Sequence, residues 1–177
     1  MSIARAQFEE ILRDSYSAYY NILPGEGAPE LPLAFRAEYR SRDERYWLTK
    51  SVKIWANETN EYTYVFSAPS FDPALAERCM DFAVQDMLPR VKPHKEHQYT
   101  NAKVILVADA LPEETVKAVK RKRFSKSYHF SLHGYSELLA AAVDLEKGRA
   151  YTNKAGYRLG SYFRKLFDAR PEKTGGK

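Results

Sequence analysis

The fold is decided by residues 33–67, which read LAFRAEYRSRDERYWLTKSVKIWANETNEYTYVFS. Apolar and polar side chains alternate in three runs along it, with the period of two that is typical of half-buried strands. The runs are Leu33–Arg40, Tyr46–Ala56 and Tyr62–Phe66, and polar connections at residues 41–44 and 57–60 separate them. A parallel crossover needs about a dozen residues or more, so connections this short join antiparallel neighbours. The stretch therefore predicts a three-stranded antiparallel meander.

The rest of the chain adds helices and strands on both sides of this stretch. Residues 104–108 read VILVA, a continuous apolar run that is typical of a strand covered on both faces. A helix and a strand at Ser127–Leu132 follow, and we expect this strand–helix–strand unit to be parallel and right-handed. The other expected elements are helices at residues 2–22, at 73–88 with Asp72 as cap, from Pro112 and at 159–168, and strands at 138–145 and 149–152.

The resulting order is α-βββ-α-β-α-β-β-β-α. It predicts an α/β (α+β) fold, a single domain at residues 1–168 built on a mixed sheet. A chain of 177 residues with 44% hydrophobic residues can fill one sizeable core. The tail at residues 169–177 contains proline and two adjacent glycines, and we expect it to be a disordered basic segment.

The composition favours a cytoplasmic protein that does not enter a membrane. No segment approaches the roughly 18 apolar residues of a membrane helix, and the N-terminus has no apolar run of the signal-peptide kind. The single Cys79 excludes an internal disulfide and fits a reducing compartment. The glycine loops of nucleotide binding and the GxSxG motif of triad hydrolases do not occur, so we expect no cofactor.

Positive charge is concentrated in one segment, residues 117–126, which carries six lysines and arginines and no acid. On a helical wheel Lys117, Lys120 and Arg121 share one face, opposite the core side. This face is a candidate for binding phosphates, including those of nucleic acid. The alternative is that these cations only complete the helix dipole and aid solubility.

The order of elements from Phe8 to Ala108 resembles the core of the PD-(D/E)xK restriction-endonuclease-like superfamily. The resemblance implies a metal-dependent nuclease in which one strand supplies an acid and the next an acid-x-Lys. The nearest matches are Glu38 and Ser51-Val52-Lys53. Ser51 stands where the second carboxylate belongs, so the resemblance implies a degenerate nuclease with Glu38 and Lys53 as its candidate residues.

The four histidines form two pairs, His94 with His97 and His129 with His133. Imidazoles are common zinc ligands, so His129 and His133 are candidate metal ligands. On one strand they would point the same way but lie about 13 Å apart, unless Gly134 begins a bend. The alternative is that all four are solvated or hydrogen-bonded side chains.

Tyrosine is abundant, with 13 residues against 9 phenylalanines. A tyrosine combines apolar area with a hydroxyl group, so several together can line an amphipathic groove for a ligand or partner. The alternative is a partly wet interface between helix and sheet. The candidates are Tyr16, Tyr19 and Tyr20 on the first helix and Tyr39, Tyr46, Tyr62 and Tyr64 on the meander.

Three segments, at residues 92–100, 127–137 and 143–156, are similar to a family of small uncharacterised bacterial proteins, and this similarity implies no function. The residues alone favour a non-enzymatic binding or interaction domain. It would contact a partner, a second copy or an anionic ligand, through the basic helix or through the Trp47, Lys53 and Trp55 face of the sheet. The alternative is the nuclease.

Overall fold

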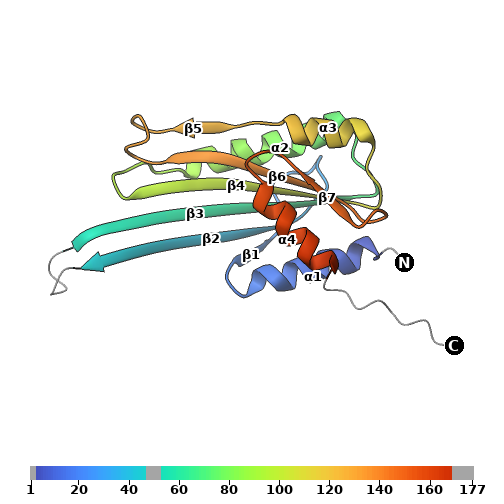
Figure 1. Cartoon of the computed structure of the whole chain (residues 1–177), viewed down its shortest axis with the longest axis horizontal. Helices are drawn as coiled ribbons and strands as arrows, with labels where there is room; N and C mark the ends of the chain where they lie inside the picture. The colour runs from blue at the N-terminus through green and yellow to red at the C-terminus, as the bar shows by residue number, and fades with distance from the viewer. Residues whose placement is uncertain (1–2, 47–52, 169–177) are drawn as a thin grey trace.

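The computed structural model describes residues 3–46 and 53–168, with side chains described outside residues 43–56. Its order of elements is the one that the sequence predicts (Figure 1). The helices are α1 (Arg5–Ser17), α2 (Pro73–Met87), the 3₁₀ turn η1 (Leu88–Arg90), α3 (Glu113–Arg121) and α4 (Tyr157–Asp168). The strands are β1 (Asn21–Pro24), β2 (Leu33–Tyr46), β3 (Lys53–Ala68), β4 (His97–Ala108), β5 (Ser125–Ser127), β6 (Tyr135–Asp144) and β7 (Arg149–Thr152).

The seven strands form one mixed sheet in the order β1-β2-β3-β4-β6-β5, with β7 paired to β6. Strands β3, β4 and β6 are parallel to one another, and the remaining pairs are antiparallel. The predicted α+β class and mixed sheet are therefore confirmed. No helix in the described part of the chain is both long enough and apolar enough to cross a membrane.

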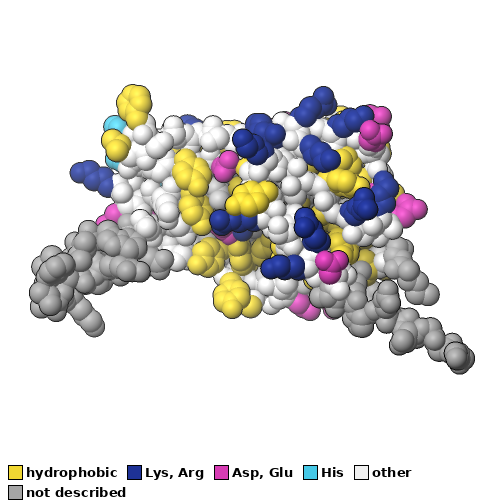
Figure 2. All heavy atoms as spheres, in the orientation of Figure 1, with side chains coloured by type: hydrophobic (Ala, Val, Ile, Leu, Met, Phe, Trp, Pro, Cys, Tyr) yellow, Lys and Arg dark blue, Asp and Glu magenta, His cyan; other side chains and the backbone are white. Residues whose placement is uncertain are grey.

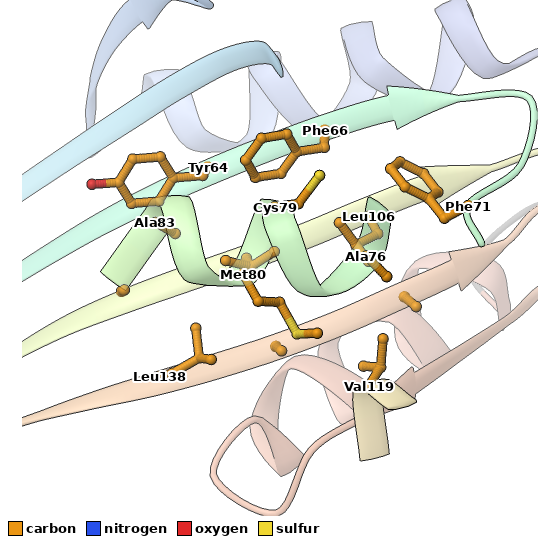
Figure 3. Packing of buried hydrophobic residues seen from close by; sticks show 14 of the residues in the cluster. Tyr64, Phe66, Phe71, Ala76, Cys79, Met80, Ala83, Leu106, Val119 and Leu138 are labelled. Atoms are coloured by element: carbon orange, nitrogen blue, oxygen red, sulfur yellow. The ribbon is translucent and has the colours of Figure 1, made fainter. Parts of the chain in front are cut away.

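Helices cover both faces of the sheet, α1 and α4 on one side and α2 and α3 on the other (Figure 1). Successive residues of β4 alternate between the two cores: Val104 and Leu106 pack toward α2, whereas Ile105 and Val107 pack toward α1 and α4. Figure 3 shows the α2 side, where Cys79 lies beside the Phe66 ring of β3 and Met80 extends toward Leu138 of β6. The predicted burial of residues 104–108 on both faces is confirmed.

The predicted bounds of the meander strands are wrong. Residues 41–44 lie inside β2 and residues 57–60 inside β3, and these two long strands pair with each other, with Asp43 opposite Asn57. The ends of β2 and β3 project past β4 as a two-stranded ribbon (Figure 1). Polar residues can continue the strands of such a ribbon. The two strands supply each other's backbone hydrogen bonds, so neither needs an apolar face buried in the core.

An antiparallel meander of three strands does exist, but its first strand is β1. The sequence predicts helix as far as Ile22, whereas α1 ends at Ser17 and Asn21–Pro24 pair with the edge of β2. Strand pairing with the edge of β2 thus overrides the helical pattern in the last residues of the predicted helix.

The predicted strand at Ser127–Leu132 is also wrong in its bounds and direction. Strand β5 ends at Ser127 and runs antiparallel to β6, so the parallel crossover from β4 passes through α3 to β6. The residues after it form a tight turn in which His129, Phe130 and Ser131 have left-handed backbone angles. The turn closes at Gly134, where a Cβ would lie 2.5 Å from carbonyl oxygens of β4. The predicted hairpin of β6 and β7 is confirmed.

Candidate functional site

Glu38 and Lys53, the two candidates implied by the nuclease resemblance, do not meet. Glu38 pairs across the strands with Tyr62 and Lys53 pairs with Tyr46. Eight residues of β2 therefore separate them, or about 26 Å along the strand. The Glu38 carboxylate instead accepts a hydrogen bond from Arg90 at 2.6 Å. Ser51 lies outside the described residues.

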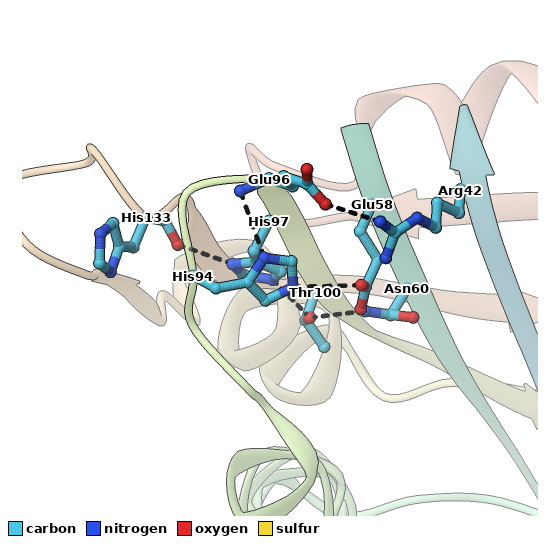
Figure 4. A network of polar contacts seen from close by, with 8 residues as sticks. All are labelled: Arg42, Glu58, Asn60, His94, Glu96, His97, Thr100 and His133. Carbon is cyan, nitrogen blue, oxygen red and sulfur yellow. Dashed lines mark hydrogen bonds and ion pairs between the residues drawn. The ribbon is translucent and has the colours of Figure 1, made fainter. Parts of the chain in front are cut away.

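His94, His97 and His133 lie near one another where β4 begins beside the turn between β5 and β6 (Figure 4). The rings of His129 and His133 lie 4.5 Å apart, because the left-handed turn folds the chain back. The separation of about 13 Å expected on a straight strand therefore does not apply, and the bend that was the alternative begins at His129, before Gly134. His97 is buried, with Nδ1 2.7 Å from the His133 carbonyl and Nε2 2.8 Å from the Thr100 hydroxyl.

Hydrogen bonds occupy His94 in the same way. Its Nε2 lies 3.1 Å from Glu58, and its Nδ1 accepts the backbone N–H of Glu96 at 3.2 Å. Within the described residues, no group of three His, Cys, Asp or Glu side chains could hold a metal ion. Desolvation and the neighbouring His129 lower the pKa of His133. The hydrogen bonds of His94 and His97 therefore connect β3 and β4 to the turn between β5 and β6.

The histidine cluster makes a testable contribution to stability at neutral pH that is lost in acid. The hydrogen bond from Asn60, together with His94, lowers the pKa of Glu58 below its ordinary value. A carboxylate with a lowered folded-state pKa stabilises the fold above its unfolded pKa, and that stability disappears as the pH falls through the folded pKa. We expect Glu58→Gln to lose about 0.5–1 kcal/mol at pH 7 and to approach the wild type below about pH 4.

Urea unfolding between pH 7 and pH 3 measures this difference. The control is Glu30→Gln, because Glu30 is a highly exposed acid paired only loosely with Arg78, at 3.4 Å. A difference between Glu58→Gln and wild type that stays constant down to pH 3 would contradict the assignment.

The basic face of α3 is partly neutralised by neighbours. Lys117 lies 2.8 Å from Glu113, which raises the pKa of Lys117, and the Lys120 ammonium lies 5.3 Å from the centre of the Tyr151 ring. Lys117, Lys120 and Arg121 do lie together on an exposed face, as predicted. Phosphate binding by this face stays a prediction. The side chains of Trp47, Lys53 and Trp55 lie outside the described ones.

A cavity of about 480 Å³ opens between the sheet, α1 and α4. Figure 2 views this face of the molecule, on which hydrophobic side chains, tyrosine included, gather beside Lys and Arg side chains. Five tyrosines from four parts of the chain line the cavity, so a tyrosine-lined groove exists. Its lining residues are Ser15, Tyr16, Tyr20, Glu61, Tyr99, Asn101, Lys103, Tyr135, Leu139, Arg158, Leu159 and Tyr162.

Of the predicted tyrosines with described side chains, Tyr16 and Tyr20 belong to this cavity, and the side chain of Tyr46 lies outside the described ones. Tyr62 and Tyr64 are buried on the opposite face of the sheet against α2. Tyr19 is an exposed side chain on the other side of the helix end. The sequence interpretation missed Tyr99, Tyr135 and Tyr162. The available signal was the period of two, which places Tyr99, Asn101 and Lys103 on one face of a strand.

An ion pair between Lys103 and Glu61, hydrogen-bonded to Tyr20, forms the inner end, or base, of the cavity. The Lys103 ammonium donates to the Glu61 carboxylate and, at 3.2 Å, to the Tyr20 hydroxyl, which itself donates to Glu61. The side chains of Lys103 and Glu61 are only 14% and 15% exposed. Burial and the bond to Glu61 raise the pKa of Tyr20, and burial raises that of Tyr16. Both hydroxyls are therefore neutral donors at pH 7.

Asn101 lies beside this base on β4 and is 8% exposed. Its amide oxygen is buried, and no donor among the described residues reaches it. A buried polar atom without a partner costs about 1–3 kcal/mol, and such atoms are rare in folded proteins. The Asn101 side chain lines the cavity with its oxygen buried in the wall, so a donor on a bound molecule reaches this oxygen when the side chain turns toward the cavity.

The part of the cavity away from this base carries aromatic rings and one cation. Tyr99 and Tyr135 are register partners on β4 and β6, with ring centroids 6.0 Å apart and planes tilted by 35°. Arg158 comes from the first turn of α4, where its Nε donates to the Tyr157 hydroxyl at 3.0 Å. That bond, with Tyr99 and Tyr135 nearby, raises the pKa of Arg158.

Fold and cavity together define an α+β protein with helices on both faces of a mixed sheet and a tyrosine-lined cavity under α1 and α4. The chain belongs to the family described as "Domain of unknown function (DUF8052)", whose family model matches residues 5–165. No curated protein and no solved structure matches the chain.

Proposed function

We propose that the protein is a binding domain that takes a small organic ligand in the tyrosine-lined cavity. The observation that carries this proposal is the amide oxygen of Asn101, which is buried beside a cavity of about 480 Å³ and has no hydrogen-bond partner among the described residues. Ligand sites in proteins have volumes of this order, mostly apolar walls and a few convergent polar groups. The cavity has all three properties.

The state of the polar groups favours binding over chemistry. Tyr16 and Tyr20 are neutral hydroxyls with raised pKa values, and the charge of Lys103 is balanced by Glu61. A general acid or base works best with a pKa near the operating pH. The Cys79 thiol packs on the opposite side of the sheet, where burial raises its pKa to about 12. These features support fixed hydrogen-bond donors and acceptors in the cavity.

We also propose that this binding takes place in the cytoplasm, which a single buried cysteine and the lack of any disulfide-forming pair in the sequence support. A protein partner, a second copy or nucleic acid at the basic face of α3 stays a prediction. The cavity lies on the other side of the sheet from α3, so the two proposals can be tested separately.

Two serines of α1 provide a matched test of the cavity. Ser15 lines the cavity and Ser17 does not, and each is exposed and donates to the carbonyl three residues before it. We expect the neutral probe 2-naphthol to bind the wild type with a Kd of the order of 1 mM or tighter, given its eleven non-hydrogen atoms. Ser15→Trp fills the mouth and should weaken binding at least about tenfold, whereas Ser17→Trp should not.

Titration of 2-naphthol into ¹⁵N-labelled protein measures both affinities, and thermal unfolding checks that each variant is folded. Equal binding by the two tryptophan variants, or no binding to the wild type, would contradict the proposed function.

A further inference from the structure

The cavity is chemically graded from base to mouth. Along β4, Tyr99, Asn101 and Lys103 line it in turn, each about 6.6 Å from the next. Lys103 is mostly buried, whereas Tyr135 is 38% exposed and Arg158 is exposed. A ligand therefore meets an ion pair and an amide at the inner end, aromatic rings in the middle and a guanidinium at the outer end.

The outer end fits an acid group. Arg158 forms no ion pair with a carboxylate in the described part of the chain, unlike Lys103, and the first turn of α4 contains no acid. The helix dipole is positive there, so an anion would be stabilised by the guanidinium and by the helix end together. Glu137, two residues after Tyr135, lines a separate hollow that also contains Arg123 and Lys154.

The middle of the cavity fits a flat ring. The Tyr99 and Tyr135 rings lie side by side on adjacent strands, and Leu139 and Leu159 add apolar surface from the sheet and from α4. Aromatic ligands pack against tyrosine rings in offset or edge arrangements. An aliphatic chain would use the same volume without this geometry.

The inner end fits a hydroxyl group. An ammonium has three donors, and Lys103 uses two of them on Glu61 and Tyr20. The Asn101 oxygen is an acceptor without a donor among the described residues. A hydroxyl can accept from Lys103 and donate to Asn101 at the same time, which a methyl group or a second carboxylate cannot do.

From these three parts, and resting on the proposed function, we infer that the ligand is a planar aromatic acid with a hydroxyl group at the end opposite its carboxylate. The carboxylate would contact Arg158, the ring would lie against Tyr99 and Tyr135, and the hydroxyl would contact Asn101 and Lys103. Tyr99 and Asn101 lie about 6.6 Å apart along β4, so a hydroxyl on a naphthalene unit packed against the Tyr99 ring would lie near the Asn101 side chain.

Three probes of one shape separate the contributions: 6-hydroxy-2-naphthoate, its carboxamide, which lacks the charge, and 2-naphthoate, which lacks the hydroxyl. We expect the hydroxy acid to bind at least about tenfold more tightly than either of the others. Arg158→Gln should abolish the preference for the acid, so that the acid and the carboxamide bind this variant equally tightly. The control is Arg164→Gln, an exposed arginine of the same helix that does not line the cavity.

The outcomes test separately whether the cavity binds a ligand and whether that ligand is a hydroxylated aromatic acid. If the carboxamide and 2-naphthol bind as tightly as the hydroxy acid, the inferred ligand class is overturned and the cavity remains a binding site. If the hydroxy acid binds equally well to Ser15→Trp, it binds elsewhere, and the inference is overturned. If no naphthalene compound binds, the proposed function fails together with the inference.

Discussion

Lys103→Met should lower the free energy of unfolding by about 3–5 kcal/mol at pH 7, because it leaves a buried carboxylate without its cation. Glu61 is 15% exposed, and its described partners are the Lys103 ammonium and the Tyr20 hydroxyl. Methionine has a similar length, so the packing of the aliphatic stem is retained. Urea unfolding followed by circular dichroism measures the loss.

The double variant Lys103→Met/Glu61→Leu is the control for this prediction. Replacing both charges removes the orphaned carboxylate, and buried ion pairs are often exchanged for apolar groups at little cost. We expect the double variant to recover more than half of the stability lost by the single one. An ordinary surface substitution changes the free energy of unfolding by about 0.5 kcal/mol or less. A change this small for Lys103→Met would mean that the ion pair is solvated and not buried at the base of the cavity.

Asn153→Ala should be comparably destabilising, by about 3–5 kcal/mol, because four backbone groups lose their partner. The Asn153 oxygen accepts from the N–H groups of Ala140 and Gly156, at 3.0 and 2.8 Å. Its nitrogen donates to the carbonyls of Lys122 and Leu138, at 3.2 and 2.9 Å. The side chain is 2% exposed, so water cannot easily replace these bonds. Thermal and urea unfolding measure the effect.

A second asparagine provides the matched control. Asn101 is buried to a similar degree, but no described donor reaches its oxygen. Asn101→Ala should therefore change the free energy of unfolding by less than about 1 kcal/mol, since no hydrogen bond to that oxygen is broken. Equal losses in the two variants would contradict the contrast between a structural asparagine and one kept for a ligand.

The order of elements could be predicted from the sequence because it depends on local periodicity and turn residues. Asp72 is an example: its side chain accepts the Leu75 N–H at 2.7 Å, the contact that a helix cap followed by proline predicts. The bounds of β2 and β3 could not be predicted in the same way. The polar residues at 41–44 suit a turn and a projecting ribbon equally well, and only the pairing of the two strands separates these alternatives.

The site was harder to predict because it depends on contacts between distant segments. The number of tyrosines indicated either a groove or a partly wet interface between helix and sheet. Which tyrosines line the groove depends on the parallel register that brings Tyr135 beside Tyr99. The contact of Lys103 with Glu61 depends on the register of β3 against β4. Nothing local in the sequence separates Asn101 from Asn153, although the Asn101 oxygen has no partner in the described part of the chain and the Asn153 side chain has four hydrogen bonds.

The side-chain amide of Asn101 tests the central claim most directly, because its NH₂ group gives a pair of signals in a ¹⁵N correlation spectrum. Asn101→Ala identifies these signals by their loss. We expect them to move progressively when 6-hydroxy-2-naphthoate or 2-naphthol is added, while the Asn153 signals stay in place. Asn101 signals that stay fixed while other parts of the protein respond to both compounds would contradict the assignment of this cavity as the binding site.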